Sequence, residues 1–233
     1  MQCFCYKYNK NYETMQKHLP ILRRVRLFTG IEDDAIPPML GCLEARTKTY
    51  QKDAFVLHAG SRPEGLGLLL SGSLFIIHED LMGNRELRAH VPMCGIFAEN
   101  FACAGDAEMD VSVIADAESE VMWLDVHRIL TTCTNACPHH TQMIRNLFAN
   151  IARANLLLNE KLTHVSRRST REKLLSYLWA ESRRQGSTEF SIPFNRQELA
   201  DYLCVDRSAM SAELSRMRKD GLLLAEKNKF ALS

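Results

Sequence analysis

The most informative segment of the chain is NRQELADYLCVDRSAMSAELSRMRKDGL, which runs from Asn195 to Leu222. Asn195 and Glu198 form a capping box, the local signal for the start of a helix. A second helix can begin almost at once with Asp206 as its cap and end at Gly221. Two short helices joined by a tight turn predict a helix-turn-helix, in which the second helix enters the major groove of DNA.

The second of these helices has two faces of different chemistry. Met210, Leu214 and Met217 recur at spacings of four and three residues and predict its buried face. The opposite face carries small and hydrogen-bonding side chains, with Arg207 as a candidate reader of a guanine edge. Residues 195–197 are expected to meet the sugar-phosphate backbone. The candidate DNA-contacting residues are Asn195, Arg196, Gln197, Asp206, Arg207, Ser208, Ser211, Ala212, Ser215 and Arg216.

The neighbouring segments complete a winged domain. Residues 222–224 and 229–232 have strand character around a basic tip, which predicts a two-stranded wing. On the other side, Ser169 and Glu172 form a further capping box and mark the start of another helix. Residues 166–233 contain 13 basic and 9 acidic side chains, so this end of the chain is basic, as expected of a DNA-binding domain.

The segment before this domain has an unusually long helical stripe of apolar residues at spacings of three and four. A lone helix cannot leave such a seam in solvent. The stripe therefore predicts either packing on the preceding domain or a parallel coiled coil with the same helix of a second copy. Its members are Ile144, Leu147, Ile151, Ala154, Leu158, Leu162 and Val165.

Further upstream, the periodicity becomes that of β-structure. Short apolar segments are separated by Gly, Pro, Asn and Asp at intervals of about ten residues, the spacing of an all-β barrel or roll. Ser71-Gly72 and Met82-Gly83-Asn84 tolerate positive φ and predict two adjacent hairpins. Before the strands, residues 19–27 and 36–45 have helical character. The predicted strands are residues 54–57, 67–70, 73–78, 86–91, 111–115 and 118–125.

The composition is that of a globular protein. The 233 residues are 46% hydrophobic and 24% charged, enough for a sizeable core. No stretch approaches the roughly 18 apolar residues needed to span a bilayer, and the first residues lack the apolar core of a signal peptide. We therefore expect a cytoplasmic protein whose eight cysteines are reduced, bound to metal or packed in the core.

The order of β-roll, stripe helix and winged helix-turn-helix resembles the CRP/FNR family of bacterial transcription regulators. The resemblance covers nearly the whole chain from Leu19 and is carried by YQKDAFVLHAG at 50–60, GLLLSGSL at 67–74, GIF at 95–97, RQELADYL at 196–203 and Arg207-Ser208 through Gly221. It implies an α+β fold made of an N-terminal arm (1–18), a jelly-roll-like, double-stranded β-roll that senses an effector (19–137), a dimerisation helix (138–165) and a winged helix-turn-helix domain (166–233).

The resemblance also implies how the protein acts. Members are homodimers joined along the stripe helix, so the stripe residues from Ile144 to Leu162 become the predicted dimer interface. An effector pocket lies between roll and helix, and the dimer binds an inverted repeat in double-stranded DNA. Binding either recruits or blocks RNA polymerase, which is thus an implied partner.

The effector-binding segment that begins at residues 95–97, here called the effector cassette, differs from that of relatives that bind cyclic AMP. Those relatives use a Gly-Glu pair to bind the ribose and an Arg-Ser pair to bind the phosphate. The matching positions are Glu99-Asn100 and Met109-Asp110, and no Lys or Arg occurs in residues 89–127. A buried phosphate without a counter-charge would cost roughly several kcal/mol, so we expect an uncharged or partly apolar effector. The residues expected to bind it, or to move with it, are Phe97, Glu99, Asn100, Phe101, Met109, Asp110, Asn155 and Asn159.

Three residues of the helix-turn-helix also depart from the family. Cys204 stands where the turn usually has Gly, so a positive φ there would hold about 1 kcal/mol of strain. Ser208 stands where many relatives place Glu, and Ala212 where many place a base-reading Arg. We expect an operator that is still palindromic but differs in sequence from those of the best-known members.

Cofactor sites have weak support in the sequence. Cys3 and Cys5 cannot reproduce the cysteine spacing of iron-sulfur relatives, so no such cluster is expected. Cys133 and Cys137, just before His139-His140, could bind metal or haem, although loop residues are the simpler interpretation.

The remaining cysteines and histidines are interpreted as structural. Cys42, Cys94 and Cys103 are expected to pack as small core residues, and His58, His78 and His90 are interpreted as structural rather than as a haem pocket. No local set of nucleophile, base and acid predicts an enzyme. The alternatives to an effector-controlled regulator are a redox- or metal-responsive switch and an effector-independent DNA-binding protein.

Overall fold

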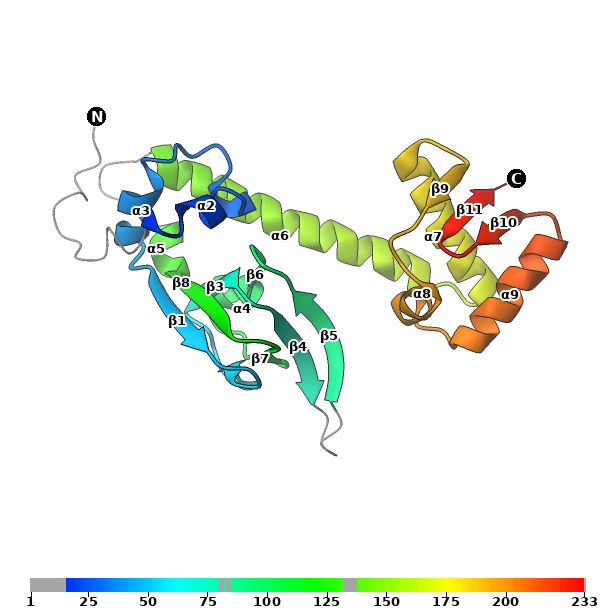
Figure 1. The fold of residues 1–233 in the computed structure, drawn as a ribbon, viewed down its shortest axis with the longest axis horizontal. Helices are drawn as coiled ribbons and strands as arrows, with labels where there is room; N and C mark the ends of the chain where they lie inside the picture. Colours follow the sequence, from blue (N-terminus) through cyan, green and yellow to red (C-terminus); the bar gives the residue numbers. More distant parts are fainter. Residues whose placement is uncertain (1–15, 80–81, 83–84, 132–137, 233) are drawn as a thin grey trace. The chain divides into compact units, whose positions relative to one another are not determined.

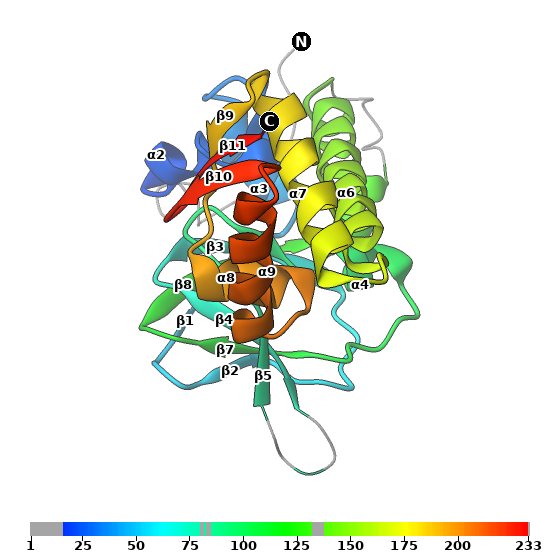
Figure 2. The same ribbon diagram turned by 90° about the vertical axis from the view of Figure 1, so that its right-hand side faces the viewer.

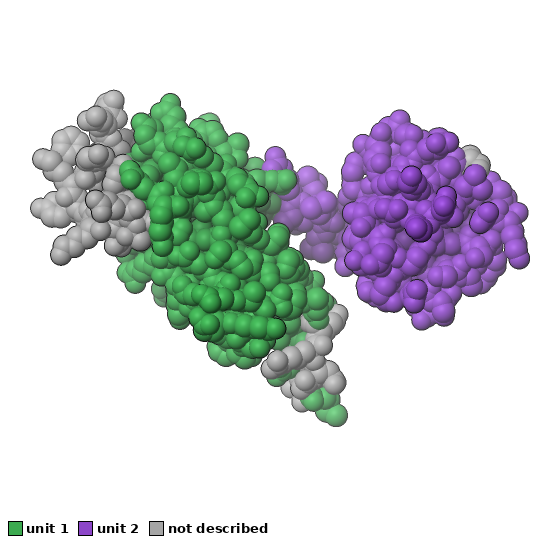
Figure 3. Space-filling model, in the orientation of Figure 1, with its two compact units in different colours: residues 1–152 green, residues 153–233 purple. Residues whose placement is uncertain are grey.

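The structure is a computed structural model that describes residues 16–79, 82, 85–131 and 138–232. It divides into two compact units, one ending at Ala152 and the other beginning at Arg153 (Figure 3). The division falls inside the 28-residue helix α6 (Pro138–Val165), so the first half of this helix belongs to one unit and the second half to the other. Each unit has its own hydrophobic core.

The N-terminal part of the first unit is helical. It comprises α2 (Leu19–Leu22), a 3-10 turn η2 (Arg26–Phe28) and α3 (Ile36–Cys42). The sequence predicts one helical stretch over residues 19–27, but the chain forms two separate turns there. Leu22, Val25, Leu27 and Phe28 are all buried, and a single helix would point Leu27 away from the other three.

The described part of the first unit also contains a roll of two four-stranded antiparallel sheets (Figure 1). One sheet contains, in spatial order, β1 (Arg46–Tyr50), β8 (Ser119–Asp125), β3 (Gly65–Ser71) and β6 (Ile96–Phe97). The other contains β2 (Phe55–Leu57), β7 (Ser112–Ala115), β4 (Leu74–Glu79) and β5 (Arg85–Val91). Most consecutive strands lie in different sheets, which confirms the predicted roll. Two short helices, α4 (Glu99–Ala104) and α5 (Val126–Leu130), follow β6 and β8.

One of the two predicted hairpins is wrong. β3 and β4 lie in different sheets, so the chain turns a corner at Gly72 instead of forming a hairpin. Gly72 has φ +86°, and a Cβ at this position would lie 2.3 Å from Oγ of Ser119. The chain also turns a corner between β7 and β8, which lie in different sheets. The two corners are in contact, because Oγ of Ser73 donates to Oδ2 of Asp116 at 2.8 Å. A corner and a hairpin both need a residue with positive φ, so the local sequence does not distinguish them.

The second predicted hairpin is confirmed. β4 pairs with β5 in antiparallel register, with Leu74 opposite Val91 and Phe75 opposite His90. Most of the turn that joins them lies outside the described residues. The strands β1 and β6 have no clear signal in the sequence, because β1 contains one buried residue, Tyr50, and β6 is only two residues long. Neither strand is long or apolar enough to show alternation.

The first half of α6 packs on the roll of its own chain. Met143 and Leu147 are 0% and 2% exposed within the core, and Ile144 and Ile151 pack against it. Nδ2 of Asn146 donates to the carbonyl oxygen of Leu27 at 2.9 Å. This corrects the assignment of Leu147 to a dimer interface, since its side chain is already used within the chain.

The second unit is a winged helix-turn-helix. After the end of α6 it contains α7 (Thr170–Gln185), β9 (Glu189–Ser191), α8 (Arg196–Leu203), α9 (Arg207–Lys219), β10 (Leu223–Glu226) and β11 (Lys229–Leu232). The predicted wing strands β10 and β11 form, and β9 adds a third strand beside β11. The strand β9 shows no alternation of apolar and polar residues. Its one buried residue, Phe190, stacks on Phe230 with ring centroids 6.1 Å apart. Together these elements confirm the predicted α+β fold.

None of the helices in the described residues is long and apolar enough to cross a membrane. α6 has sufficient length, but charged and amide side chains interrupt its apolar residues.

Candidate nucleic-acid interface

The helix α8 begins with the predicted capping box. Oδ1 of Asn195 accepts from the backbone N–H groups of Gln197 and Glu198 at 2.9 and 3.0 Å, and Oε2 of Glu198 accepts from N–H of Asn195 at 2.7 Å. Nε2 of Gln197 donates to Oδ1 of Asp201 at 2.8 Å. Asn195 and Gln197, two of the three side chains predicted to meet the DNA backbone, therefore also stabilise α8.

Arg196 has a different position from the one expected of a free phosphate ligand. Its guanidinium carbon lies 5.1 Å from the ring centroid of Phe230, on β11. The side chain is partly buried, and burial lowers its pKa. Arg196 thus links α8 to the wing, and it also stacks on an aromatic ring as arginines commonly do.

The turn between α8 and α9 has the geometry that the sequence predicts. Cys204 has φ +52° and ψ +57°, the left-handed conformation that a glycine adopts more easily. Lys173 of α7 offsets part of the strain of this conformation, because its Nζ lies 3.3 Å from the carbonyl oxygens of both Leu203 and Cys204. A cation at this point is also favoured by the negative end of the α8 dipole.

The helix α9 has the two faces that its periodicity predicts. Met210, Leu214 and Met217 are 0%, 5% and 0% exposed. Figure 2 shows α9 beside α8 and the strand β10, both of which it contacts. The exposed face of α9 carries all six predicted outer residues, Arg207, Ser208, Ser211, Ala212, Ser215 and Arg216.

Hydrogen bonds within α9 and at its N-cap determine which donor and acceptor atoms of its polar side chains are already used. Oδ1 of Asp206 accepts from N–H of Ala209 at 2.8 Å and from Oγ of Ser208, and these bonds lower the pKa of Asp206. Oγ of Ser211 and Oγ of Ser215 each donate to the carbonyl four residues earlier, both at 2.9 Å. With their protons so used, these hydroxyls present oxygen lone pairs to a partner.

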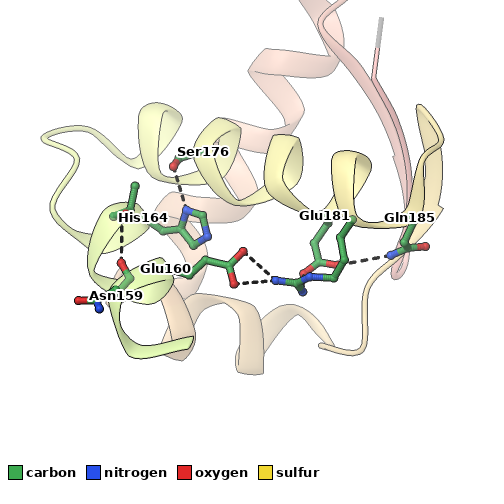
Figure 4. A network of polar contacts seen from close by, with 8 residues as sticks. Asn159, Glu160, His164, Ser176, Glu181 and Gln185 are labelled. Atoms are coloured by element: carbon green, nitrogen blue, oxygen red, sulfur yellow. Dashed lines mark hydrogen bonds and ion pairs between the residues drawn. The ribbon is translucent and has the colours of Figure 1, made fainter. Parts of the chain in front are cut away.

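The end of α6 is joined to α7 by a polar network (Figure 4). Both carboxylate oxygens of Glu160 accept from Nη2 of Arg184 at 2.7 Å, and Arg184 also pairs with Glu181. Nδ1 of His164 lies 2.8 Å from Oγ of Ser176, and the His164 ring is T-shaped to that of Tyr177 at 5.7 Å. Desolvation lowers the pKa of His164, so this 3% exposed ring is held neutral. The last turns of α6 therefore pack against α7, and the two form one body.

The residues predicted to bind an effector are divided between the two units. Phe97 and Met109 are 2% and 3% exposed in the core of the roll, and Phe101 packs against that core. Asn155 and Asn159, of the second unit, are hydrogen-bonded to each other on α6 at 2.7 Å.

The polar residues of the cassette lie at its edge. Glu99 is half-buried, and Nδ2 of Asn150 lies 3.5 Å from its Oε1. Burial raises the pKa of Glu99, whereas Asn100 and Asp110 are exposed.

Arg62 is a cation next to the effector cassette that the local sequence pattern does not indicate. Nη2 of Arg62 donates to Oε1 of Glu108 at 2.7 Å, although Arg62 precedes Glu108 by 46 residues. The pair is exposed, with side-chain exposures of 61% and 58%. Arg62 is thus already paired with a carboxylate, one residue before Met109.

Among the described cysteines, Cys94 and Cys103 pack against the core of the first unit, as predicted, whereas Cys204 is exposed. Cys94, Cys103 and Cys204 are free, whereas Cys42 is disulfide-bonded. The disulfide corrects the expectation that Cys42 is a reduced core residue. Cys3, Cys5, Cys133 and Cys137 lie outside the described residues. Among residues that are described, no group of three or more His, Cys, Asp or Glu side chains could hold a metal ion.

The histidines proposed as structural have separate environments. His58 stacks on Phe55 with ring centroids 4.3 Å apart, and His90 lies 5.7 Å from Phe75. His78 lies on β4. The structure therefore places these three side chains on strands or at strand ends, each beside its own neighbours.

Comparisons with known proteins find one matching domain family and several solved structures with a similar fold. Residues 172–232 match the family described as the Crp-like helix-turn-helix domain, and no curated protein matches the sequence. Among solved structures, CprK complexed with OCPA is similar with a TM-score of 0.53 and 12% identity, over 82% of this chain and 88% of that one. The c-di-GMP responsive regulator CLP of Xanthomonas campestris has a TM-score of 0.51 and 17% identity, over 82% and 95%. The catabolite activator protein of Thermus thermophilus has a TM-score of 0.48 and 20% identity, over 89% and 93%.

Proposed function

We propose that the protein is a dimeric transcription regulator, because residues 172–232 match the Crp-like helix-turn-helix domain and the fold is similar to that of the solved structures of CprK and CLP. The dimer binds an inverted-repeat operator under the control of a small molecule other than cyclic AMP. It recruits or blocks RNA polymerase at that site. Because its partner is DNA, the proposal places the protein in the cytoplasm.

The observation that carries this proposal is the exposed face of α9. Its side chains are short or flexible, so the helix can approach the floor of a major groove closely. Arg207, at the start of the helix, has a guanidinium that can form two hydrogen bonds to a guanine edge. Arg216, two and a half turns later, is 65% exposed and suits a phosphate.

A dimer is supported by the apolar side chains that α6 exposes beyond Leu147. Phe148, Leu156, Leu158 and Leu162 are 75%, 68%, 55% and 52% exposed in the single chain. A second copy of the same helix would cover Phe148, Leu158 and Leu162, which lie on one side of α6, in a coiled-coil arrangement. In the proposed interface, Ile144, Ile151 and Ala154 flank the exposed leucines, and two reading heads then meet half-sites about one helical turn apart.

The effector is proposed from the charges of the cassette. Residues 89–127 contain no Lys or Arg, and Arg62 is already paired with Glu108. An anionic ligand would find little compensation there, so an uncharged or partly apolar molecule fits better. Such a ligand would act by its difference in affinity between two arrangements of the dimer. Titration with cyclic AMP should give no saturable heat below millimolar ligand, and micromolar binding would contradict this part.

The experiment that tests the function combines two measurements on the full-length protein. Sedimentation analysis should give a dimer, and selection from random duplexes should enrich one inverted repeat. A monomer with no preference for any palindrome, with or without candidate metabolites, would overturn the proposal. Unchanged operator affinity after thiol alkylation would exclude the redox alternative, and an organic ligand that changes affinity would exclude the effector-independent one.

A further inference from the structure

Arg171, in the first turn of α7, contacts α9 through two carboxylates that lie two helical turns apart. Its Nε donates to Oε1 of Glu213 at 2.6 Å, and its Nη2 donates to Oδ2 of Asp220 at 2.5 Å. The Glu213 side chain is 10% exposed, whereas that of Asp220 is 48% exposed. The guanidinium satisfies both acceptors because its donors point in fixed, different directions, which a lysine ammonium cannot reproduce.

Glu213 extends these contacts to the outer side of α9. Its second oxygen, Oε2, forms an ion pair with Nη1 of Arg216, with the two atoms 3.1 Å apart. One largely buried carboxylate therefore joins Arg171 of α7 to an exposed cation of α9. Hydrogen bonds to Glu213 and Asp220 raise the pKa of Arg171, so its charge is present at every physiological pH.

The packing of α9 explains why such contacts are needed. The inner face of α9 meets the core through apolar side chains, Met210, Leu214 and Met217, and apolar burial has no preferred direction. Apolar contacts alone would tolerate small rotations of α9 about its own axis. Charge-assisted hydrogen bonds are directional and stronger than neutral ones, so two of them set both the rotation and the axial position of the helix.

We propose that Arg171 is a positioning residue for DNA recognition, which fixes the rotation of α9 and, through Glu213, aims Arg216 at a phosphate. The inference rests on the proposed function of α9 in DNA binding. Arg171 itself need not touch DNA. It also neutralises two carboxylates that would otherwise repel the phosphates when α9 docks.

The first test compares four forms of the full-length protein on the selected operator and on a random duplex of equal length. They are the wild type, Arg171→Ala, Arg171→Lys and the control Arg183→Ala. Arg183 is exposed on the same helix, so the control removes the same charge from α7. We expect Arg171→Ala to weaken operator binding about tenfold, Arg171→Lys to recover little of it, and Arg183→Ala to change it less than about threefold.

A double-mutant cycle with Arg216→Ala separates positioning from a general structural role. If Arg171 acts through Glu213 on Arg216, the loss caused by Arg171→Ala should fall from about tenfold to about threefold in the Arg216→Ala background. Equal losses in both backgrounds would overturn the proposal, as would identical behaviour of Arg171→Ala and Arg183→Ala. Thermal unfolding of each variant identifies losses that come from unfolding.

A second variant keeps the test valid if Arg171→Ala does not fold. Glu213→Gln preserves the shape of the side chain and removes its charge, and it enters the same cycle with Arg216→Ala. Coupling supports the proposal, and additivity overturns it. If the wild type prefers no duplex at all, the proposed function fails instead, before the positioning role is tested.

Discussion

The two units differ in how they hold their candidate site residues. In the first unit, Phe97 and Met109 are 2% and 3% exposed within the core of the roll. In the second unit, Arg207 and Ser211 lie on the exposed face of α9. A helix that reads DNA must present side chains outward, whereas a roll that binds a small molecule must accommodate it among core residues. Truncation of a site residue should therefore damage folding in the first unit and binding in the second.

Phe97→Ala should give the largest effect and test the first half of this comparison. The Phe97 ring packs edge to face against Trp123 with centroids 5.5 Å apart. Its loss should cost about 3–5 kcal/mol of unfolding free energy, as for other buried aromatic residues. Chemical denaturation should show the loss in the first unit only.

The control for Phe97 is Phe55→Ala on β2, whose side chain is 37% exposed and stacks on His58. This control should cost no more than about 1–2 kcal/mol. If both variants lose the same unfolding free energy, the buried Phe97 contributes no more to stability than the exposed Phe55. The proposed contrast between buried site residues in the first unit and exposed ones in the second would then be wrong.

Arg207→Ala should show the opposite behaviour. Arg207 forms no ion pair among the described residues and lies at the exposed start of α9, so the unfolding free energy should hardly change. Operator binding should weaken by about 1–3 kcal/mol, with relaxed preference at one base pair, as measured by fluorescence anisotropy on single-base operator variants.

Arg216→Ala provides the matched comparison on the same helix. Its loss should weaken all sequences alike and reduce the slope of log affinity against log salt by about 1. If Arg207→Ala leaves the base preference intact, Arg207 does not read a base.

A pH titration of stability should sharpen the comparison further. His164 is the only histidine after Ala152 in the sequence, and its folded-state pKa is lowered by burial. In the unfolded chain His164 binds a proton as the pH falls through about 6.5, whereas in the folded second unit it does so only at a lower pH. Its stability should therefore be complete above about pH 6.5 and fall below it by at most about 1.4 kcal/mol per pH unit.

His164→Gln is the control for this titration. The glutamine side chain does not titrate, so the acid-induced loss of stability in the second unit should flatten just below about pH 6.5. The first unit holds the other histidines, including the buried His18 and His140 with lowered pKa values, and its pH dependence should not change. An unaltered slope in the second unit would show that His164 does not cause it.

Glycine substitutions at positive φ should give the smallest effect. Cys204 in the second unit and Ala98 in the first have φ +52° and +62°. Cys204→Gly and Ala98→Gly should each stabilise their own unit by about 0.5–1 kcal/mol, because glycine adopts this conformation without strain. Calorimetry of each variant measures both transitions, and destabilisation would mean that lost side-chain contacts outweigh the relieved strain.

The second unit was the easier of the two to predict. Its helix boundaries follow from residues within four positions of one another. This holds for the helix starts at Ser169, Asn195 and Asp206 and for the helix end at Gly221. In contrast, β9 was missed, since its three residues carry a single apolar side chain.

The first unit was predicted in outline but not in its connections. Its predicted strands form, but the corner at Gly72 was mistaken for a hairpin, since the sheet that receives β4 is chosen by distant partners. The stripe of α6 was found, but not the fact that Leu147 packs on the roll and Leu158 is exposed. The ion pair of Arg62 with Glu108 also joins residues far apart in sequence.

The helix-turn-helix, the wing and the roll class follow from local patterns in the chain, because caps, turns and periodicity are properties of neighbouring residues. Long-range packing selects which strands share a sheet and which part of the α6 stripe is buried. It also decides that Arg171 holds α9 through Glu213, 42 residues away. These contacts depend on how distant segments approach one another, and periodicity within a short window carries no information about that approach.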